Sequence, residues 1–135
     1  MTVAPLLDTH AWIWWMDADP RLGSTELDAL NHLSDEMRPR VCDISLWEVA
    51  TFVERNRLSF RIPFADWVHA AADPRAVQLL PLTPAIATEI AALPKSFHRD
   101  PADRVIVATS RVMRIPVLAG DRRITRSRLV EKWVP

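Results

Sequence analysis

Apolar and polar positions along the chain predict strands and helices in turn. Short apolar runs are typical of buried strands, and longer segments with apolar positions at helical spacing are typical of helices. Strands are expected at residues 3–7, 40–44, 77–82 and 116–119, with an edge strand at 129–134. Helices are expected at residues 10–16, 24–35, 45–56, 64–72, 83–93 and 101–113. This alternation predicts an α/β fold: a three-layer α/β/α sandwich with a central parallel sheet of four to five strands.

Length and composition fit a folded protein. The chain has 135 residues, of which 49% are hydrophobic, so it can bury a core, and residues 1–135 are expected to form a single domain. Cys42 is the only cysteine, which excludes an intrachain disulfide and a cysteine metal cage. The first apolar stretch is interrupted by Asp8 and His10 and no basic region precedes it. We therefore expect no membrane span or signal peptide, and a cytoplasmic protein.

The net charge of zero conceals an asymmetry along the chain. Residues 1–94 carry 7 Lys and Arg against 13 Asp and Glu, whereas residues 95–135 carry 10 against 4. Fifteen of the seventeen basic residues are arginine, whose planar guanidinium suits contacts with phosphate or carboxylate. A nucleic-acid backbone and an acidic protein segment are the two partners that this basic part would suit.

Four acidic residues are predicted at one edge of the sheet. Asp8 follows the first strand, Asp121 follows the strand at 116–119, and Glu48 and Asp103 lie in the first turns of helices that start at that edge. The carboxyl ends of parallel strands share one edge, where functional crevices of such sheets lie. Clustered carboxylates require a cation, and hard oxygen ligands favour Mg²⁺ or Mn²⁺. The chemistry that follows is metal-assisted attack of water on a phosphodiester.

Helix capping is the alternative explanation for two of these acids. Ser45 and Glu48 match a capping box, in which the glutamate satisfies a backbone N–H. Asp100 is a good N-cap before Pro101, and Asp103 would complement the helix dipole. Either carboxylate alone is therefore explained by the start of a helix.

Two other Asp-Pro pairs act as internal controls for this interpretation. Asp19-Pro20 and Asp73-Pro74 have no acidic residue three positions after the aspartate. Asp-Pro is thus a common helix start or turn in this chain, and the additional acid at Asp103 needs another explanation.

Four segments together resemble a known family. They are LLDTHAWIW (6–14), ISLWEVA (44–50), LPKSFHRDPADRVIVATS (93–110) and PVLAGDRRI (116–124). In order and spacing they resemble the successive motifs of PIN-domain ribonucleases, and most closely the VapC-type toxins of type II toxin–antitoxin pairs.

The resemblance implies an α/β/α sandwich with a Mg²⁺- or Mn²⁺-dependent site that cuts RNA. It also implies a small VapB-like antitoxin that blocks the site. As the assembly we expect a homodimer or higher oligomer. Carried over by position, Asp8, Glu48, Asp103 and Asp121 are the catalytic and metal-binding acids. Thr9 would orient the first of them or a metal-bound water.

One departure from the pattern concerns the fourth acid. Many relatives have threonine or serine two residues before it, whereas this chain has Ala119, although Gly120 still permits a tight turn. A catalytically weak PIN-fold module that mainly engages an antitoxin or RNA therefore stays as an alternative. A phosphoacceptor receiver domain fits poorly, because the first strand is followed by Asp8-Thr9 rather than by adjacent acids.

Other candidate residues concern the substrate. His98 lies near the acids and could act as a proton shuttle or metal ligand, but as a lone histidine in a loop it is interpreted as a surface or substrate-contacting residue. Arg104, Arg122 and Arg123 flank the acids and could contact RNA phosphates or acidic groups of an antitoxin, with a solvated basic face as the alternative. Tryptophans that lie in predicted helices with apolar neighbours are interpreted as packing residues rather than platforms for bases. These are Trp12, Trp14, Trp15 and Trp47.

Overall fold

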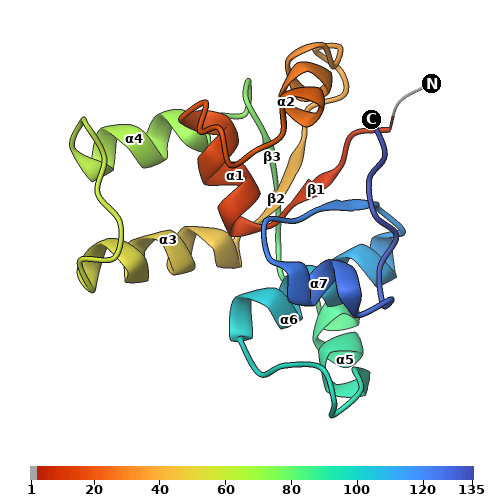
Figure 1. The fold of residues 1–135 in the computed structure, drawn as a ribbon. Coiled ribbons are helices and arrows are strands. Elements are labelled where there is room, and N and C mark those ends of the chain that lie inside the picture. The colour runs from red at the N-terminus through yellow and green to blue at the C-terminus, as the bar shows by residue number, and fades with distance from the viewer. Residues whose placement is uncertain (1–2) are drawn as a thin grey trace.

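A four-stranded parallel sheet lies at the centre of the computed structural model, which describes residues 3–135 (Figure 1). Its strands are β1 (Leu6–Leu7), β2 (Arg40–Cys42), β3 (Gln78–Leu80) and β4 (Val117–Leu118). Their order is β3-β2-β1-β4, and every neighbouring pair is parallel. The predicted parallel sheet is confirmed.

Helices connect and follow these strands. They are α1 (Thr9–Met16), α2 (Ser24–Asn31), α3 (Ile44–Glu54), α4 (Phe64–Ala71), α5 (Pro84–Ala92), α6 (Pro101–Met113) and α7 (Arg122–Arg126). The six expected helices are present, although α2 ends four residues before the predicted end. Helix α7 was not predicted. No helix within residues 3–135 is both long and apolar enough to cross a membrane.

The strands are shorter than predicted, and a proline directly precedes β1, β2 and β4. A proline contributes a carbonyl acceptor to a ladder but no N–H donor. Thus Pro5, Pro39 and Pro116 accept hydrogen bonds from the backbone N–H groups of Arg40, Gln78 and Leu6 at 2.9, 2.9 and 2.8 Å. Sheet pairing therefore continues for one residue beyond the regular strands.

The prediction of an edge strand at residues 129–134 is wrong. This segment forms only an isolated parallel bridge between Lys132 and Val117. Trp133 redirects it, because its ring is buried and the indole N–H donates to the carbonyl of Val3 at 2.7 Å. The segment therefore covers the open side of β4 without extending the sheet.

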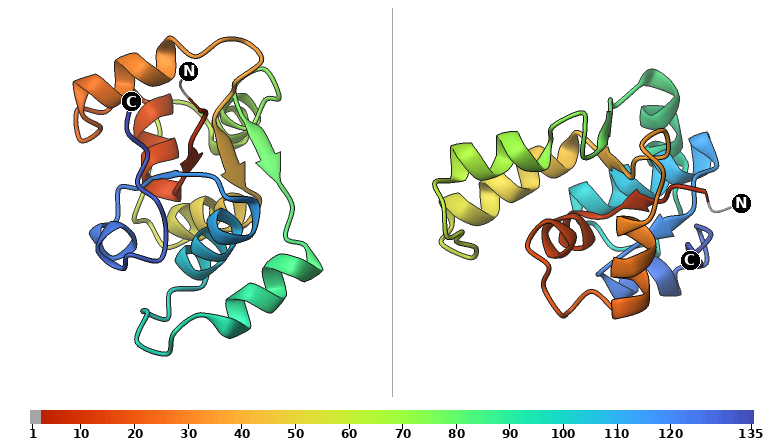
Figure 2. Two further views of the ribbon diagram at one scale, coloured as in Figure 1. Left: turned by 90° about the vertical axis from the view of Figure 1, so that its right-hand side faces the viewer. Right: turned by 90° about the horizontal axis from the view of Figure 1, so that it is seen from above.

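Two apolar cores lie on opposite faces of the sheet, since successive strand residues point to opposite sides. One core joins Leu6 and Cys42 to residues of α5, α6 and α7. The other joins Leu7 and Val41 to residues of α1, α2, α3 and α4. Figure 2 shows α5 and α6 on the other side of the sheet from α1 and α2. The three-layer α/β/α arrangement is confirmed.

The tryptophans differ in their burial. Trp12 is completely buried, as predicted for a packing residue, and its indole N–H donates to the carbonyl of Ala71 at 3.0 Å. Trp47 is 52% exposed, so the structure does not place it in either core.

Candidate active site

The predicted acids meet at the carboxyl edge of the sheet, around a cleft of about 400 Å³. Glu48 from α3, Asp103 from α6 and Asp121 after β4 border this cleft together with Asp100. Asp8 follows β1 and is 1% exposed, so it lies within the protein. The edge inferred from strand order therefore does carry the cluster.

Asp8 connects the end of β1 to the turn after β4. Its Oδ1 accepts from the backbone N–H of Ala11 at 2.8 Å, which caps α1. Both oxygens accept from Gly120 N–H at 2.9 Å, and Oδ2 also accepts from Asp121 N–H at 3.1 Å. Burial raises the pKa of Asp8, while these N–H donors oppose the increase. The carboxylate therefore fixes the backbone that presents Asp121.

Glycine is needed at position 120 because there is no room for a side chain, and not because the backbone adopts an unusual angle. A Cβ at this position would lie 2.7 Å from ring carbons of Trp14 and 2.9 Å from Cβ of His10. Its φ is not positive, so the expected reason, a conformation that favours glycine, does not apply. The close approach of α1 to this turn is what excludes a side chain.

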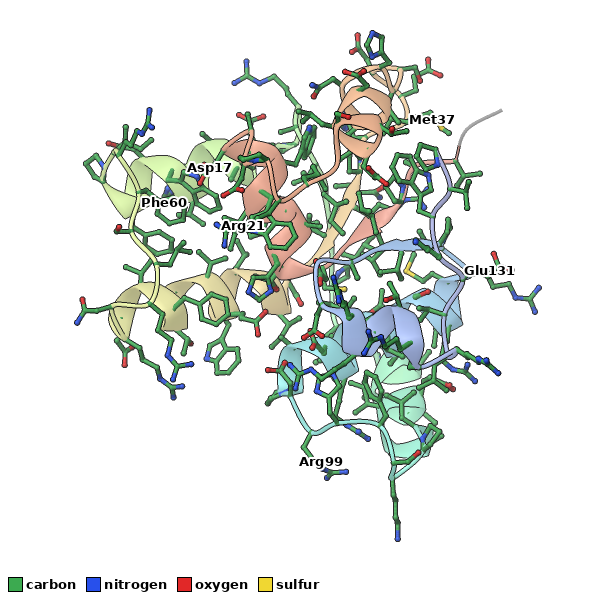
Figure 3. The ribbon with its side chains drawn as sticks, in the orientation of Figure 1. Asp17, Arg21, Met37, Phe60, Arg99 and Glu131 are labelled. Carbon is green, nitrogen blue, oxygen red and sulfur yellow. The ribbon has the colours of Figure 1, made fainter. Side chains whose placement is uncertain are left out.

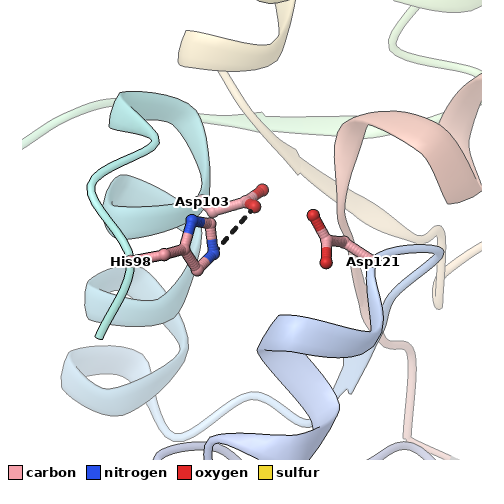
Figure 4. A group of neighbouring side chains, drawn as sticks. All are labelled: His98, Asp103 and Asp121. Atoms are coloured by element: carbon pink, nitrogen blue, oxygen red, sulfur yellow. Dashed lines mark ion pairs between the residues drawn. The ribbon is translucent and has the colours of Figure 1, made fainter. Parts of the chain in front are cut away.

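Asp103 is the most strongly perturbed acid of the cleft. It is 6% exposed, and burial, together with the charges of Asp100 and Asp121, raises its pKa to about 9. The Nε2 atom of His98 lies 3.1 Å from Asp103 Oδ2 (Figure 4). Burial followed by the charge of Arg123 lowers the pKa of His98, so its ring is neutral near pH 7. Asp103 thus lacks a full countercharge.

Asp121 has such a countercharge in Arg123. The carboxylate accepts from the Arg123 backbone N–H at 2.8 Å, and Nη2 of the same residue lies 2.8 Å from Oδ2. This pairing lowers the pKa of Asp121 to about 2. Arg123 Nη2 also lies 4.0 Å from Asp103 Oδ2, at the limit of an ion pair. The cleft therefore places an ionised acid beside one that is held protonated.

The capping box proposed for Ser45 and Glu48 does not form. Helix α3 begins at Ile44, so Ser45 lies inside it, and its Oγ is 2.8 Å from Oγ1 of Thr9. Glu48 is 7% exposed and borders the cleft, and burial raises its pKa against the opposing effect of the Thr9 hydroxyl. Capping therefore does not explain Glu48. Thr9 contacts α3 from a buried position next to Asp8.

Asp100 does cap its helix. Its Oδ1 accepts from the backbone N–H of Asp103 at 3.0 Å, and Pro101 is the first residue of α6. The same carboxylate borders the cleft. The predicted start of the helix is confirmed, and it orients Asp103 toward the other acids.

The predicted substrate-contacting arginines have different surroundings. Arg104 is 9% exposed, and its guanidinium donates to the carbonyls of Phe97 and His98 at 3.2 Å. It therefore supports the loop that carries His98 from inside the protein. Arg122 is exposed, and Arg123 borders the cleft.

Among the basic residues and histidines that border the cleft, three were not predicted from the sequence: His10, Arg21 and Arg57. A signal for Arg21 was available, because Asp-x-Arg occurs in three turns of the chain. Each aspartate accepts from the backbone N–H and the guanidinium of the arginine two residues later. The turns are at residues 19–21, 73–75 and 121–123. No comparable pattern identifies His10 or Arg57.

The donor set fits a divalent cation. Atoms of His98, Asp103 and Asp121 all lie within 4.8 Å of one another. Within residues 3–135, His98 Nε2 is the buried side-chain atom without a hydrogen-bond partner, because its contact with Asp103 is not aligned as a hydrogen bond. A cation at this point would satisfy that atom and replace the proton that Asp103 holds.

The fold and the site together define an α/β protein with a candidate metal site at the carboxyl edge of a parallel sheet. The family model for the PIN domain matches residues 6–128, so the chain belongs to the PIN domain family. The family expected from the four sequence motifs is confirmed.

Two known proteins are similar to this chain. Ribonuclease VapC22 of Mycobacterium tuberculosis is 36% identical over 123 residues, which are 91% of each chain. The solved structure of a toxin-antitoxin complex from Klebsiella pneumoniae contains a chain that matches with a TM-score of 0.52 and 17% identity. That match covers 84% of this chain and 83% of the other, and it supports the fold alone.

Proposed function

We propose that this protein is a metal-dependent endoribonuclease and the toxin of a toxin–antitoxin pair. The similar protein of M. tuberculosis is named a ribonuclease of the VapC type. The observation that carries the proposal is the cleft in which Glu48, Asp103 and Asp121 meet at the carboxyl edge of the sheet. A buried acid with its pKa raised to about 9 is typical of a functional site.

We infer that the ion is Mg²⁺ or Mn²⁺, because carboxylate oxygens dominate the donor set. We propose Asp103 and Asp121 as ligands, together with Glu48 in the acidic wall of the cleft and the buried Asp8. Asp8 is also a positioning residue, because it holds the backbone of Asp121. When bound, the ion would activate water and stabilise the charge that develops on the leaving oxygen of a phosphodiester.

The protein groups around the acids prepare the site. Asp103 retains a proton near neutral pH in the absence of a cation, and cation binding would release that proton. Arg123 holds Asp121 ionised through Nε and Nη2, which leaves Nη1 of its guanidinium available for phosphate. His98 is neutral and faces Asp103 from the loop before α6.

The proposed partners follow from the same assignment. They are RNA as substrate and a small VapB-like antitoxin that blocks the cleft, with a homodimer or higher oligomer as the assembly. We propose one PIN domain over residues 1–135 and a cytoplasmic site of action, where RNA is accessible.

Cleavage of RNA tests this function directly. Purified protein with Mn²⁺ or Mg²⁺ is expected to cut single-stranded RNA, and EDTA or Asp103→Asn is expected to abolish the cut. Equal cleavage by the wild type and by Asp103→Asn would contradict the proposal, because a contaminating nuclease would explain it.

A catalytically weak binding module is the second candidate, favoured by Ala119, where many members of the family carry threonine or serine. It predicts that the protein binds RNA or an antitoxin but cuts no RNA with either ion.

A further inference from the structure

The cleft has a second wall, which faces the acids and is built differently. Helix α1 contributes His10 and Trp14, and the C-terminal part of α3 contributes Phe52. The imidazole of His10 lies between the two rings, with centroids 5.9 Å from Trp14 and 5.6 Å from Phe52. Arg21 and Arg57, from the loops after α1 and α3, complete the wall. We call these five residues the cationic wall.

Arg21 is held in place on this wall. Its backbone N–H and Nε donate to Oδ1 of Asp19 at 2.9 and 3.1 Å, and Nη2 donates to Oδ2 at 2.7 Å. The guanidinium carbon lies 5.3 Å from the ring centroid of Trp14, within the range of a cation–π contact. Figure 3 shows Arg21 alongside α1. The side chain is therefore ordered before any ligand binds, although it is 67% exposed.

Arg75 forms the same turn without these surroundings. It donates to Asp73 from its backbone N–H, Nε and Nη2 at 2.8, 3.1 and 2.9 Å. It is 92% exposed, it does not border the cleft, and within residues 3–135 it makes no cation–π contact. The Asp-x-Arg turn is therefore a local device for fixing an arginine. Its position at residues 19–21 is what brings a guanidinium to the cleft.

Both arginines of the wall retain binding capacity. Asp19 occupies Nε and Nη2 of Arg21, so Nη1 remains free to donate. Arg57 has no carboxylate within ion-pair distance in the described part of the chain. A strand that presents a phosphate to the acidic wall can also reach the cationic wall, because both border one cleft.

We propose that Arg21 and Arg57 form a subsite for a backbone phosphate of single-stranded RNA, adjacent to the phosphate that is cut. This inference rests on the proposed ribonuclease function. The ligand is a phosphate rather than a base, because Arg21 already covers a face of Trp14 and guanidinium groups match phosphate oxygens. The subsite therefore contributes affinity without sequence preference and requires a substrate that extends beyond the scissile bond.

RNA binding without cleavage isolates this subsite. We would measure anisotropy of a short fluorescein-labelled single-stranded RNA in the Asp103→Asn background, between about 50 and 200 mM salt. Arg21→Ala and Arg57→Ala are each expected to weaken binding about five- to tenfold and to reduce the salt slope by about 0.7. Arg75→Ala, which breaks the same turn outside the cleft, is the matched control and should bind RNA as its parent does.

Two further measurements make the assignment specific. The loss for Arg21→Ala should be equal for RNAs of different sequence, and Arg21→Lys should recover part of the affinity because it keeps the charge. Thermal unfolding checks that each variant is folded. If Arg21→Ala is not folded, Arg21→Lys is compared with the parent instead.

The possible failures can be told apart. A wild type that cuts RNA while Arg21→Ala and Arg57→Ala bind like Arg75→Ala would overturn the subsite and leave the ribonuclease assignment intact. A loss confined to one RNA sequence would assign base recognition instead of phosphate binding. A loss of affinity for an acidic antitoxin peptide with unchanged RNA binding would also overturn it. A wild type that neither binds nor cuts RNA would overturn both proposals.

Discussion

Helices α4 and α6 each carry an aspartate at their third residue, and the two sites behave differently. Asp66 in α4 is exposed, whereas Asp103 in α6 is 6% exposed and faces three other carboxylates. Both positions let a carboxylate interact favourably with the helix N-terminus. Only the start of α6 lies at the carboxyl edge of the sheet beside Asp121. The position of an aspartate within its helix therefore does not distinguish a role at the helix start from a role in catalysis. The position of the helix on the sheet does.

The largest expected difference between the two aspartates is in catalysis. Asp103→Asn should lower metal-dependent RNA cleavage at least about 100-fold, because it removes a proposed ligand from the cleft. Asp66→Asn makes the same substitution at the same helical position and should leave the rate within about twofold. Initial rates with Mn²⁺, measured on proteins with matched circular dichroism, check the comparison. Similar losses in the two variants would refute it.

Substitutions of Asp8 and of Asp103 should differ in their effect on the stability of the protein. Asp8→Asn offers one acceptor oxygen where three backbone N–H groups now donate, so it should lower the free energy of unfolding by about 1–3 kcal/mol. Activity should also fall, because the turn that carries Asp121 loses its anchor. Urea denaturation of the metal-free protein measures the effect. A fully stable Asp8→Asn variant would contradict the anchoring role.

Metal-free stability should depend on pH through Asp103. Its pKa is raised on folding, so the folded state binds more protons than the unfolded state between about pH 4 and pH 9. Stability should therefore fall as pH rises through that range, with Tm about 3–6 °C lower at pH 8 than at pH 5. Asp103→Asn should remove much of this fall, and Mn²⁺ should reverse it. An increase of Tm toward pH 8 without metal would have the wrong sign.

Asp100 should give the smallest effect of the acids near α6. Asparagine caps helices about as well as aspartate, so Asp100→Asn should change stability by less than about 0.5 kcal/mol and keep most of the activity. Asp100→Ala removes the bond to Asp103 N–H and should cost about 1 kcal/mol. Thermal unfolding of the pair distinguishes capping from charge. A larger loss of activity in Asp100→Asn than in Asp100→Ala would contradict this division.

Much of the fold could be predicted because local patterns and sheet topology agree. The alternation of apolar runs and helical segments located the four strands, the six longer helices and the edge where the acids meet. Asp100 and Pro101 fixed the start of α6 through the chemistry of helix capping.

The remaining features depend on tertiary contacts that a linear pattern does not contain. Ser45 matched a cap by its spacing, but it lies inside α3, where its hydroxyl contacts that of Thr9. Arg104 is charged and adjacent to a candidate ligand, yet carbonyl groups of a neighbouring loop bury it. The second wall of the cleft depends on how α1 approaches Gly120, which no local motif encodes.

The central claim is that Asp103 at the sheet edge holds a divalent ion, whereas the equivalent aspartate of α4 does not. Titration of Mn²⁺ into metal-free protein by calorimetry tests it directly. We expect wild type and Asp66→Asn to bind Mn²⁺ with equal affinity, and Asp103→Asn to bind at least about tenfold more weakly. Equal Mn²⁺ affinity in Asp103→Asn and the wild type would contradict the account.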